Sequence, residues 1–201
     1  RKTVAAGGFD RAAYNELAEL GLAGLYISEA DGGIGMGPVE GMVVMEELGR
    51  GIVLEPLTQT LIAGGVLSGY GSDALKAQWL PKIASGETLV VLAYQERKAR
   101  YRLDVCEAKA THSSAGWSLS ATKDMAPAGD HADAFIVPAT VDGTIALFLV
   151  ERNASGVTTR GYGTQDGARA ADLQLVNAPA SLITTDGLAA LEHAIDIGIA
   201  A

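Results

Sequence analysis

"GWSLSATKDMAPAGDHADAFIV", residues 116–137, is the stretch that most strongly predicts the architecture of the chain. Apolar and polar residues alternate as it opens, and it closes on an unbroken apolar run; both patterns are typical of strands. Similar short runs lie on either side of it, separated by Gly, Asn, Asp or Pro. Regularly spaced short strands suggest an antiparallel sandwich or barrel. The flanking runs cover residues 88–95, 106–113, 144–152, 156–162 and 170–177.

The part of the chain before these strands predicts helices. Asp10 suits the N-cap of a first helix, and Pro38 suits the first turn of a second. A third helix, over residues 54–71, is apolar nearly all round, so we expect it at the buried centre of a bundle. Ser72 or Asp73 can cap a fourth helix, in which Pro81 predicts a kink or a restart.

The pattern becomes helical again after Ala180. The order of helices, strands and helices indicates an α+β fold with segregated elements, and not βαβ alternation. We expect an N-terminal helical domain over residues 1–87, a middle β-domain over 88–180, and the beginning of a C-terminal helical domain over 181–201. The chain opens without Met and closes inside an apolar helical pattern, so we expect it to be part of a longer protein.

Composition restricts the class of protein. Of 201 residues, 48% are hydrophobic and 19% charged, which predicts a globular core. The net charge of −9 argues against binding of nucleic acid or anionic membranes. A single cysteine cannot form an internal disulfide, and with three histidines a zinc site is not expected. The single cysteine fits a reducing cytoplasm, where we expect the protein to be. No apolar span of 18 residues occurs, so we expect a soluble chain.

Several motifs that could carry chemistry are better explained structurally. "DGGIGMG", residues 31–37, lacks the spacing and the strand–helix context of a dinucleotide-binding loop, so we interpret it as a flexible loop between helices. No serine nucleophile elbow occurs. Glu46 and Glu47 are adjacent on a helix and therefore point apart, which favours a solvated helix face.

The histidines and the cysteine give no catalytic set. His112, His131 and His193 are far apart in sequence and are expected in a turn, a loop and a helix. Cys106 is expected in a strand as a structural thiol. No residue of the chain therefore stands out as a general base.

A cationic segment follows the first strand-like run. Arg97, Lys98, Arg100 and Arg102 lie within six residues of an acidic chain. Two interpretations stay open: a solvated loop with surface ion pairs, or a phosphate-binding cradle, for which the planar guanidinium group is well suited.

Several stretches together resemble the acyl-CoA dehydrogenase family. "AQWLPKIASGE", residues 77–87, is similar to the family's "LPKLASGE" motif before its β-domain. Residues 116–137, quoted above, follow the family's hairpin "GYVLNGTKTWITNGGDADLFVV" without a gap. The similarity extends to "ELGLAGLYISEADGGIGMGPVEGMVVMEELGRG" and "LFLVERNASGV", and so covers nearly the whole chain. "AYQER" and "RGYGTQDGARAADL" look most like the small subunit of pimeloyl-CoA dehydrogenase-type enzymes.

The resemblance implies an N-terminal helical domain, a middle β-domain and a C-terminal helical domain, in agreement with the pattern of the residues. It also implies FAD-dependent α,β-dehydrogenation of an acyl-CoA thioester in fatty acid metabolism, with hydride transfer to flavin N5 and electron-transfer flavoprotein as the acceptor. The family's catalytic glutamate lies in most members in the C-terminal helical domain, so the resemblance places no catalytic residue in this chain. The family also implies a homo- or hetero-oligomer.

The chain departs from the family around the flavin. The family has Thr-Glu-Pro after its apolar strand, with the last strand residue and Thr at the flavin pyrimidine edge; here these four positions are Tyr94, Gln95, Glu96 and Arg97. The backbone amides of Tyr94 and Gln95 could still serve FAD. The family's Trp-Ile-Thr becomes Met125, Ala126 and Pro127. Methionine can pack on a ring face, whereas proline offers neither a hydroxyl nor an N–H group.

The cationic segment replaces the family's loop after Thr-Glu-Pro and therefore is expected near flavin and CoA. The resemblance thus favours Arg97, Lys98, Arg100 and Arg102 as phosphate-binding residues. The leading hypothesis is an acyl-CoA dehydrogenase subunit. The alternatives are a non-catalytic partner subunit of a heteromeric dehydrogenase and a flavin-dependent monooxygenase of the same fold.

Overall fold

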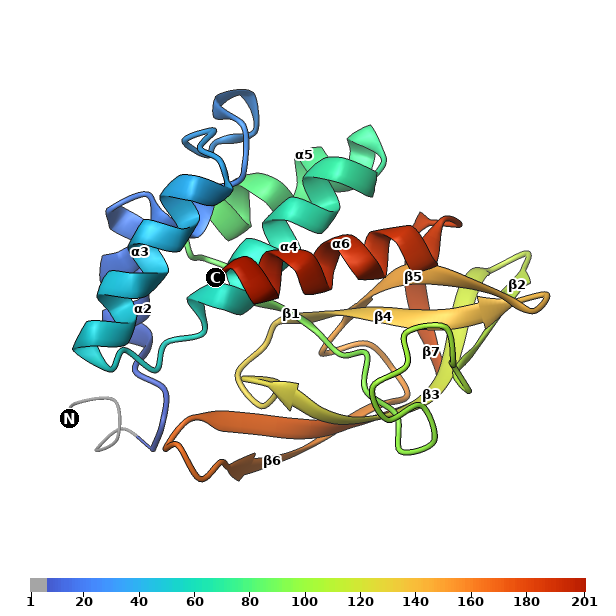
Figure 1. The fold of residues 1–201 in the computed structure, drawn as a ribbon. Helices are drawn as coiled ribbons and strands as arrows, with labels where there is room; N and C mark the ends of the chain where they lie inside the picture. Colours follow the sequence, from blue (N-terminus) through green and yellow to red (C-terminus); the bar gives the residue numbers. More distant parts are fainter. Residues whose placement is uncertain (1–6) are drawn as a thin grey trace.

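Helices and strands occupy separate layers, with the helices stacked on one side of a barrel (Figure 1). The computed structural model describes residues 7–201. The helical elements are α2 (Arg11–Glu19), the short 3-10 turns η1 (Leu22–Gly24) and η2 (Glu29–Asp31), α3 (Pro38–Gly51), α4 (Leu57–Tyr70), α5 (Asp73–Ala84) and α6 (Gly187–Ala200). The strands are β1 (Val90–Leu92), β2 (Lys109–Ser113), β3 (Gly116–Pro127), β4 (Ala134–Val141), β5 (Thr144–Glu151), β6 (Val157–Gly163) and β7 (Arg169–Thr184). The predicted α+β class is confirmed.

The predicted helix starts are confirmed by their capping bonds. The side chain of Asp10 accepts hydrogen bonds from the amides of the first turn of α2, and the hydroxyl of Ser72 does the same for α5. Pro38 opens α3. Helix α5 runs through Pro81 to Ala84, so the predicted restart is wrong; the proline removes only one backbone donor.

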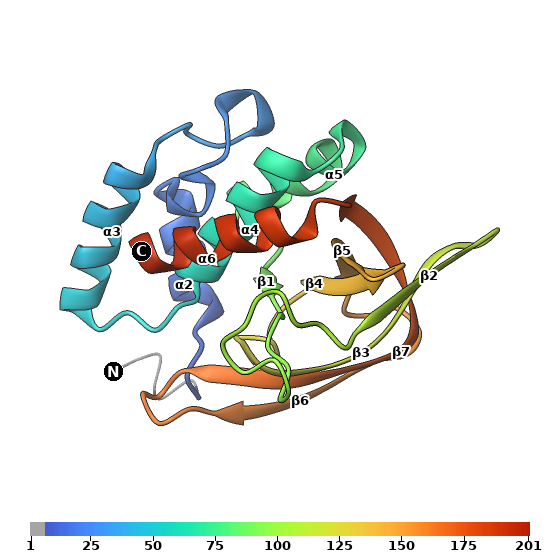
Figure 2. The same cartoon turned by 45° about the vertical axis from the view of Figure 1, so that its right-hand side comes forward.

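Helix α4 is the centre of the helical layer, as its apolar sequence predicted. It packs against α5 and α6 on its sides and against β1 below (Figure 2). Its side chains join those of the barrel's outer face in one core, which includes Val66 and Leu67 of α4, Ile136 of β4, Leu147 of β5 and Leu191 of α6. Helices and barrel therefore share buried surface.

The strands close into a barrel. Strands β4, β2, β3, β7 and β5 pair in that order, and β5 pairs back with β4. The pairs are antiparallel except those of β1 and β2 with β4, which are parallel, so the expectation of a purely antiparallel sheet is corrected. Strand β1 is the first strand after the helices, and it pairs with residues 134–136 of β4. Its three residues are buried, and their side chains enter the two cores on either side of the sheet.

Strand β4 explains the unbroken apolar run of the opening stretch. Phe135 and Val137 point into the barrel core, while Ala134 and Ile136 point into the core shared with the helices. A strand buried on both faces needs apolar residues at every position, so it cannot alternate.

The end of the barrel differs from the sequence prediction. The pattern was expected to become helical after Ala180, but β7 continues to Thr184 and α6 begins at Gly187. The last residues of β7 pair with β5, with Leu182 opposite Phe148. This pairing adds strand structure that a local apolar pattern does not distinguish from a helix. The boundaries proposed at residues 87 and 180 stay a prediction.

Candidate cofactor site

Two segments far apart in sequence meet where β1 leaves the sheet and β3 ends. Tyr94 and Gln95 follow β1, and the amide of Asp124 in β3 donates a hydrogen bond to the carbonyl oxygen of Gln95 at 2.9 Å. The next residues of β3 are Met125, Ala126 and Pro127. The structure therefore brings the five residues predicted to bind a cofactor into one region.

The Tyr94–Gln95 segment presents unused backbone donors. Within residues 7–201, the amides of Tyr94 and Gln95 donate no hydrogen bond, although both residues are only partly exposed. The side-chain amide of Gln95 donates to the Tyr94 hydroxyl at 3.4 Å. Backbone amides of this kind usually have a partner, so they are candidates for binding acceptor atoms of a ligand.

Strand β3 bulges at Met125. The register against β7 shifts between Lys123 and Ala126, and Met125 has φ of +52° and a residue exposure of 48%. Such backbone is uncommon for a long side chain, and bulges turn a side chain out of its strand. Ala126 is buried in the barrel core, whereas Pro127 is exposed. Met125 and Pro127 are therefore the side chains of this segment that a ligand could touch.

Asp172 of β7 holds the bulge in place, and sequence reasoning missed it. Its carboxylate accepts hydrogen bonds from the amide of Met125 at 3.3 Å, from Arg160 at 2.8 Å and from the Tyr162 hydroxyl at 3.1 Å. Burial raises the pKa of Asp172, but the bonds from Arg160, Met125 and Tyr162 outweigh it and lower the pKa overall. The side chain thus stays ionised as the acceptor beneath Met125.

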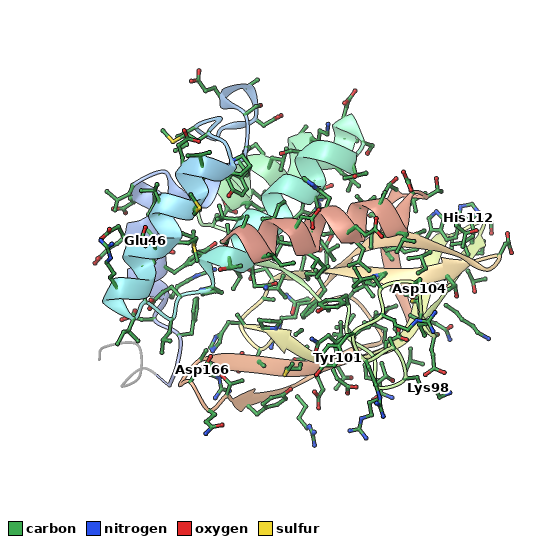
Figure 3. The ribbon with its side chains drawn as sticks, viewed as in Figure 1. Glu46, Lys98, Tyr101, Asp104, His112 and Asp166 are labelled. Carbon is green, nitrogen blue, oxygen red and sulfur yellow. The ribbon has the colours of Figure 1, made fainter. Side chains whose placement is uncertain are left out.

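The cationic segment projects from the barrel on the side away from the helices (Figure 3). Three of its four cations have carboxylate partners in the same chain. Lys98 pairs with Glu107 at 2.6 Å, Arg102 pairs with Asp104 at 2.6 Å, and Arg97 lies 3.6 Å from Asp124. These hydrogen bonds raise the pKa of both Lys98 and Arg102. The ion-pair partners reduce the positive charge that the segment offers to a ligand.

Arg100 differs from the other three cations. In the part of the chain that the structure describes, no ion pair involves Arg100. It is exposed, has φ of +52°, and precedes Tyr101, which is 97% exposed. Arg100 is therefore the cation of this segment that is free to meet an anion.

Two cavities flank the region. One, of about 720 Å³, lies beside the bulge between the base of the cationic segment and strands β3, β6 and β7. The other, of about 410 Å³, lies between α3, the start of α4 and the end of β3, with Pro127 in its wall. Met45, Leu48, Val53, Leu54 and Gln59 are also in the wall of this second cavity.

The remaining candidates of the sequence have structural roles. Cys106 lies before β2, not within a strand, because pairing begins only at Lys109. Burial raises the pKa of its thiol, which opposes a nucleophilic role. Glu46 and Glu47 both bond to Arg50 on the exposed face of α3, as expected of a solvated helix face. No group of side chains in residues 7–201 could hold a metal ion.

The three histidines lie against aromatic rings. His112 is in β2 and not in the predicted turn, and its ring centroid lies 4.7 Å from that of Trp117. His131 and His193 lie in a turn and in α6, beside Phe9 and Tyr70 respectively. None of them lines the cavity beside the bulge at Met125.

Comparison with known proteins identifies the fold and its lineage. A family model described as "Acyl-CoA dehydrogenase, N-terminal domain" matches residues 1–87. The acyl-CoA dehydrogenase FadE27 of Mycobacterium tuberculosis is 29% identical over 157 residues, which are 78% of this chain and 41% of the relative. The chain belongs to the acyl-CoA dehydrogenase family.

Solved acyl-CoA dehydrogenases have the same arrangement. A glutaryl-coenzyme A dehydrogenase in complex with glutaryl-CoA has a TM-score of 0.86 at 27% identity, covering 92% of this chain and 51% of that one. The ChsE4–ChsE5 complex from Mycobacterium tuberculosis has a TM-score of 0.81 at 26% identity, covering 96% and 51%. The chain thus spans about half the length of these solved relatives, and about two fifths of FadE27. Similarity to the pimeloyl-CoA dehydrogenase small subunit stays a prediction.

The candidate site has groups that suit FAD at Tyr94, Gln95 and Met125, and it lacks a donor at Pro127. The free amides of Tyr94 and Gln95 and the exposed thioether of Met125 suit the polar edge and the face of a flat heterocycle. Pro127 lies on the second cavity but has no N–H group to donate. The residues present therefore fit the group, with one donor fewer than the family pattern.

Proposed function

We propose that this chain supplies the flavin-binding β-domain of an acyl-CoA dehydrogenase subunit that oxidises an acyl-CoA thioester to its 2,3-enoyl form. The observation that carries the proposal is the hydrogen bond from the amide of Asp124 to the carbonyl oxygen of Gln95, which joins the two predicted cofactor segments. Beside this bond, the amides of Tyr94 and Gln95 have no partner within residues 7–201. Electron-transfer flavoprotein is the proposed electron acceptor, and an oligomer is the proposed assembly.

FAD, when bound, supplies the hydride acceptor that side chains lack. The amides of Tyr94 and Gln95 would hold the pyrimidine edge of the ring, and Met125 would pack on its face. Ala126 would contribute only backbone, because its side chain lies in the barrel core. Pro127 would limit the space at the ring without donating a hydrogen bond. These residues bind and orient; none of them takes the α proton.

The acyl group has a suitable place beside Pro127. The wall of the cavity of about 410 Å³ holds apolar side chains of α3 and of the segment before α4, which suit a hydrocarbon chain, beside the charged side chains of Glu55, Asp166 and Arg169. Gln59 on its wall accepts a hydrogen bond from the amide of Leu92 at 3.0 Å, which ties α4 to β1 directly before Tyr94. We place the catalytic glutamate in the C-terminal helical domain of the whole protein.

A second candidate is a non-catalytic partner subunit of a heteromeric dehydrogenase. The replacement of the family's Trp-Ile-Thr by Met125, Ala126 and Pro127 favours it, because the chain then lacks donors at the reactive side of the ring. A solved relative is itself a complex of two differently named chains, ChsE4 and ChsE5.

The absorption spectrum separates the two candidates. If the proposal is right, the purified protein is yellow, absorbs at about 450 nm as flavins do, and binds FAD with about one site per chain after the flavin is stripped. A colourless protein that takes up no added FAD contradicts the proposal and leaves the partner-subunit role. The isolated chain and the whole protein, with any partner subunit, are both measured, since a partner can complete the site.

A further inference from the structure

A lysine is buried inside the barrel where strand alternation alone predicts a small or apolar side chain. Lys123 of β3 is 0% exposed, and its Nζ donates a hydrogen bond to Oε1 of Glu96 at 2.6 Å. Isolation of an ammonium group from water is costly unless it is paired. Lys123 is therefore held by Glu96, a residue that follows Gln95 directly.

The carboxylate of Glu96 joins three segments of the chain. Besides Lys123, it accepts hydrogen bonds from the amide of Glu107 at 2.5 Å and from the amide of Ala108 at 3.2 Å. These amides stand at the far end of the cationic segment, at the entry to β2. Glu96 therefore joins the two ends of the loop that carries the cationic segment, and it attaches both ends to Lys123 of β3.

The carboxyl group of Glu96 is buried, and its neighbours favour its charged form. Burial alone raises the pKa of Glu96, but the charge of Lys123 and the bonds from Lys123 and the two amides outweigh it, so the pKa is lowered. The Cys106 thiol lies 3.6 Å from the carboxylate and 3.8 Å from the ammonium group. A charged pair with this many hydrogen bonds has a fixed geometry.

The pair is adjacent in sequence to the residues of the cofactor site in both segments, the one after β1 and the end of β3. Glu96 follows Gln95, and Lys123 precedes Asp124, whose amide bonds to the Gln95 carbonyl oxygen. The ion pair of Lys123 with Glu96 and the backbone hydrogen bond of Asp124 with Gln95 therefore connect the same two segments at neighbouring positions. Tyr94 and Met125 are the next residues of these two segments.

We propose that Glu96 and Lys123 are positioning residues, which fix the distance and angle between the Tyr94–Gln95 amides and the Met125 bulge. The proposal rests on the proposed FAD site, to which it adds the groups that hold the site in shape. Neither side chain is placed in contact with the cofactor. Loss of Glu96 leaves the buried charge of Lys123 uncompensated and its hydrogen-bond donors unsatisfied, and loss of Lys123 leaves the charge of Glu96 uncompensated. Either change should therefore separate the Tyr94–Gln95 segment from the end of β3.

Four variants test the pair in the whole protein: Glu96→Gln, Lys123→Met, the double variant that carries both, and Arg50→Met as the control. Arg50 is also a cation paired with glutamates, but it is exposed and lies in α3, outside both segments. FAD affinity is measured at a temperature where each variant is folded. We expect both single variants to weaken FAD binding about tenfold or more, because small displacements of positioned groups cost this much. Arg50→Met stays within about twofold of wild type.

The double variant separates positioning from stability. Without buried charge it should melt closer to wild type than the single variants do, yet its FAD affinity should remain about tenfold weaker, because the carboxylate that ties the amides of Glu107 and Ala108 is gone. A folded single or double variant that binds FAD as wild type does would overturn the proposal.

Hydrogen exchange tests the pair independently of FAD. In the variants that remove Glu96 or Lys123, the amides of Glu107, Ala108 and Asp124 should exchange faster than in wild type, with the amides of β5 unchanged as an internal reference. If the wild-type protein binds no FAD, the proposed function fails and this measurement alone decides the inference. Unchanged exchange at all three amides would overturn it, and the double variant provides the result if the single variants do not fold.

Discussion

At the scale of single residues, the candidate site contains some residues that the sequence predicts and others, Lys123 and Asp172, whose roles appear only in the structure. The resemblance pointed to Tyr94, Gln95 and Met125, and the structure brings them together. Lys123 and Asp172 could not be found in this way. A lysine in an alternating strand is normally expected to face solvent, and Lys123 is buried because Glu96, 27 residues earlier in the chain, reaches it from a loop.

The cationic segment gives a prediction about single arginines. Because Arg100 has no ion pair within the described residues and Arg102 is paired with Asp104, only Arg100 is available to a phosphate group. We expect Arg100→Ala to raise the dissociation constant of a CoA ester about threefold to tenfold at low ionic strength, and less at about 0.5 M salt.

Arg102→Ala is the matched control and should change the dissociation constant less than about twofold. Isothermal titration with CoA and with FAD as separate ligands shows which phosphate is contacted. If neither dissociation constant changes in Arg100→Ala, the segment is a solvated loop.

The pair of Glu96 and Lys123 predicts how stability depends on pH. The pKa of Glu96 in the folded protein lies below its ordinary value of 4.5. Its contribution is therefore fully present above pH 4.5 and is lost as the pH falls through the lower, folded pKa. Glu96→Gln should lower the free energy of unfolding by about 3–5 kcal/mol at pH 7, since it leaves Lys123 buried without its counter-ion.

Urea unfolding of wild type and Glu96→Gln from pH 7 to about pH 3 checks this prediction. The difference between the two proteins should be constant at neutral pH and should shrink in acid, because protonated Glu96 resembles glutamine. A difference that grows on acidification would contradict an ionised pair.

At the scale of elements, capping residues and apolar patterns predicted most helices, whereas pairing partners decided the strands. Asp10, Pro38 and Ser72 begin helices through bonds within a few residues, so the sequence alone can show them. The parallel pairing of β1 with β4 and the extension of β7 to Thr184 depend on strands far away in sequence. A local pattern does not contain that information.

The loop of residues 31–37 was expected to be flexible, but its backbone is bonded onto η1 and the turn that follows it. The amide of Ile34 donates to the carbonyl oxygen of Gly24 at 3.1 Å, and the amide of Gly35 to that of Ile27 at 2.8 Å. A Cβ atom at Gly33 would lie 2.1 Å from the carbonyl oxygen of Ile27. The glycine is required by the close approach of two backbones, and not by phosphate binding.

Two glycine substitutions test this explanation. Gly33→Ala should destabilise the protein by about 1–3 kcal/mol, because the backbone atoms it meets cannot move aside freely. Gly49→Ala is the control: Gly49 lies in α3 with no atom within 4 Å of its added Cβ, and alanine there should stabilise the helix by about 0.5–1 kcal/mol. Denaturant unfolding measures both. Equal effects in the two variants would show that Gly33 has no special role.

At the scale of the whole molecule, the helices and the barrel share one core around α4, β1 and β4. The cavity of about 410 Å³ lies between α3, the start of α4 and the end of β3, and the proposed function expects the acyl group to meet the flavin there, at Pro127. The α+β class and the order of the elements followed from the sequence, since apolar patterns change clearly along it. The closure of the barrel did not, because it arises from the return of β5 to β4.

No helix within residues 7–201 is long and apolar enough to cross a membrane. The expectation of a cytoplasmic protein stays a prediction, as do the acyl-CoA substrate and the partner subunit.

Anaerobic reduction of the bound flavin by an acyl-CoA ester tests dehydrogenation directly. The FAD-loaded protein, with its partner subunit where one exists, is mixed with a series of acyl-CoA esters of increasing length and branching. We predict that at least one ester bleaches the absorbance at about 450 nm within the mixing experiment and yields the 2,3-enoyl product. A flavin that stays oxidised with every ester, and is reduced only by a separate reductase before it reacts with dioxygen, would contradict dehydrogenation and indicate a monooxygenase.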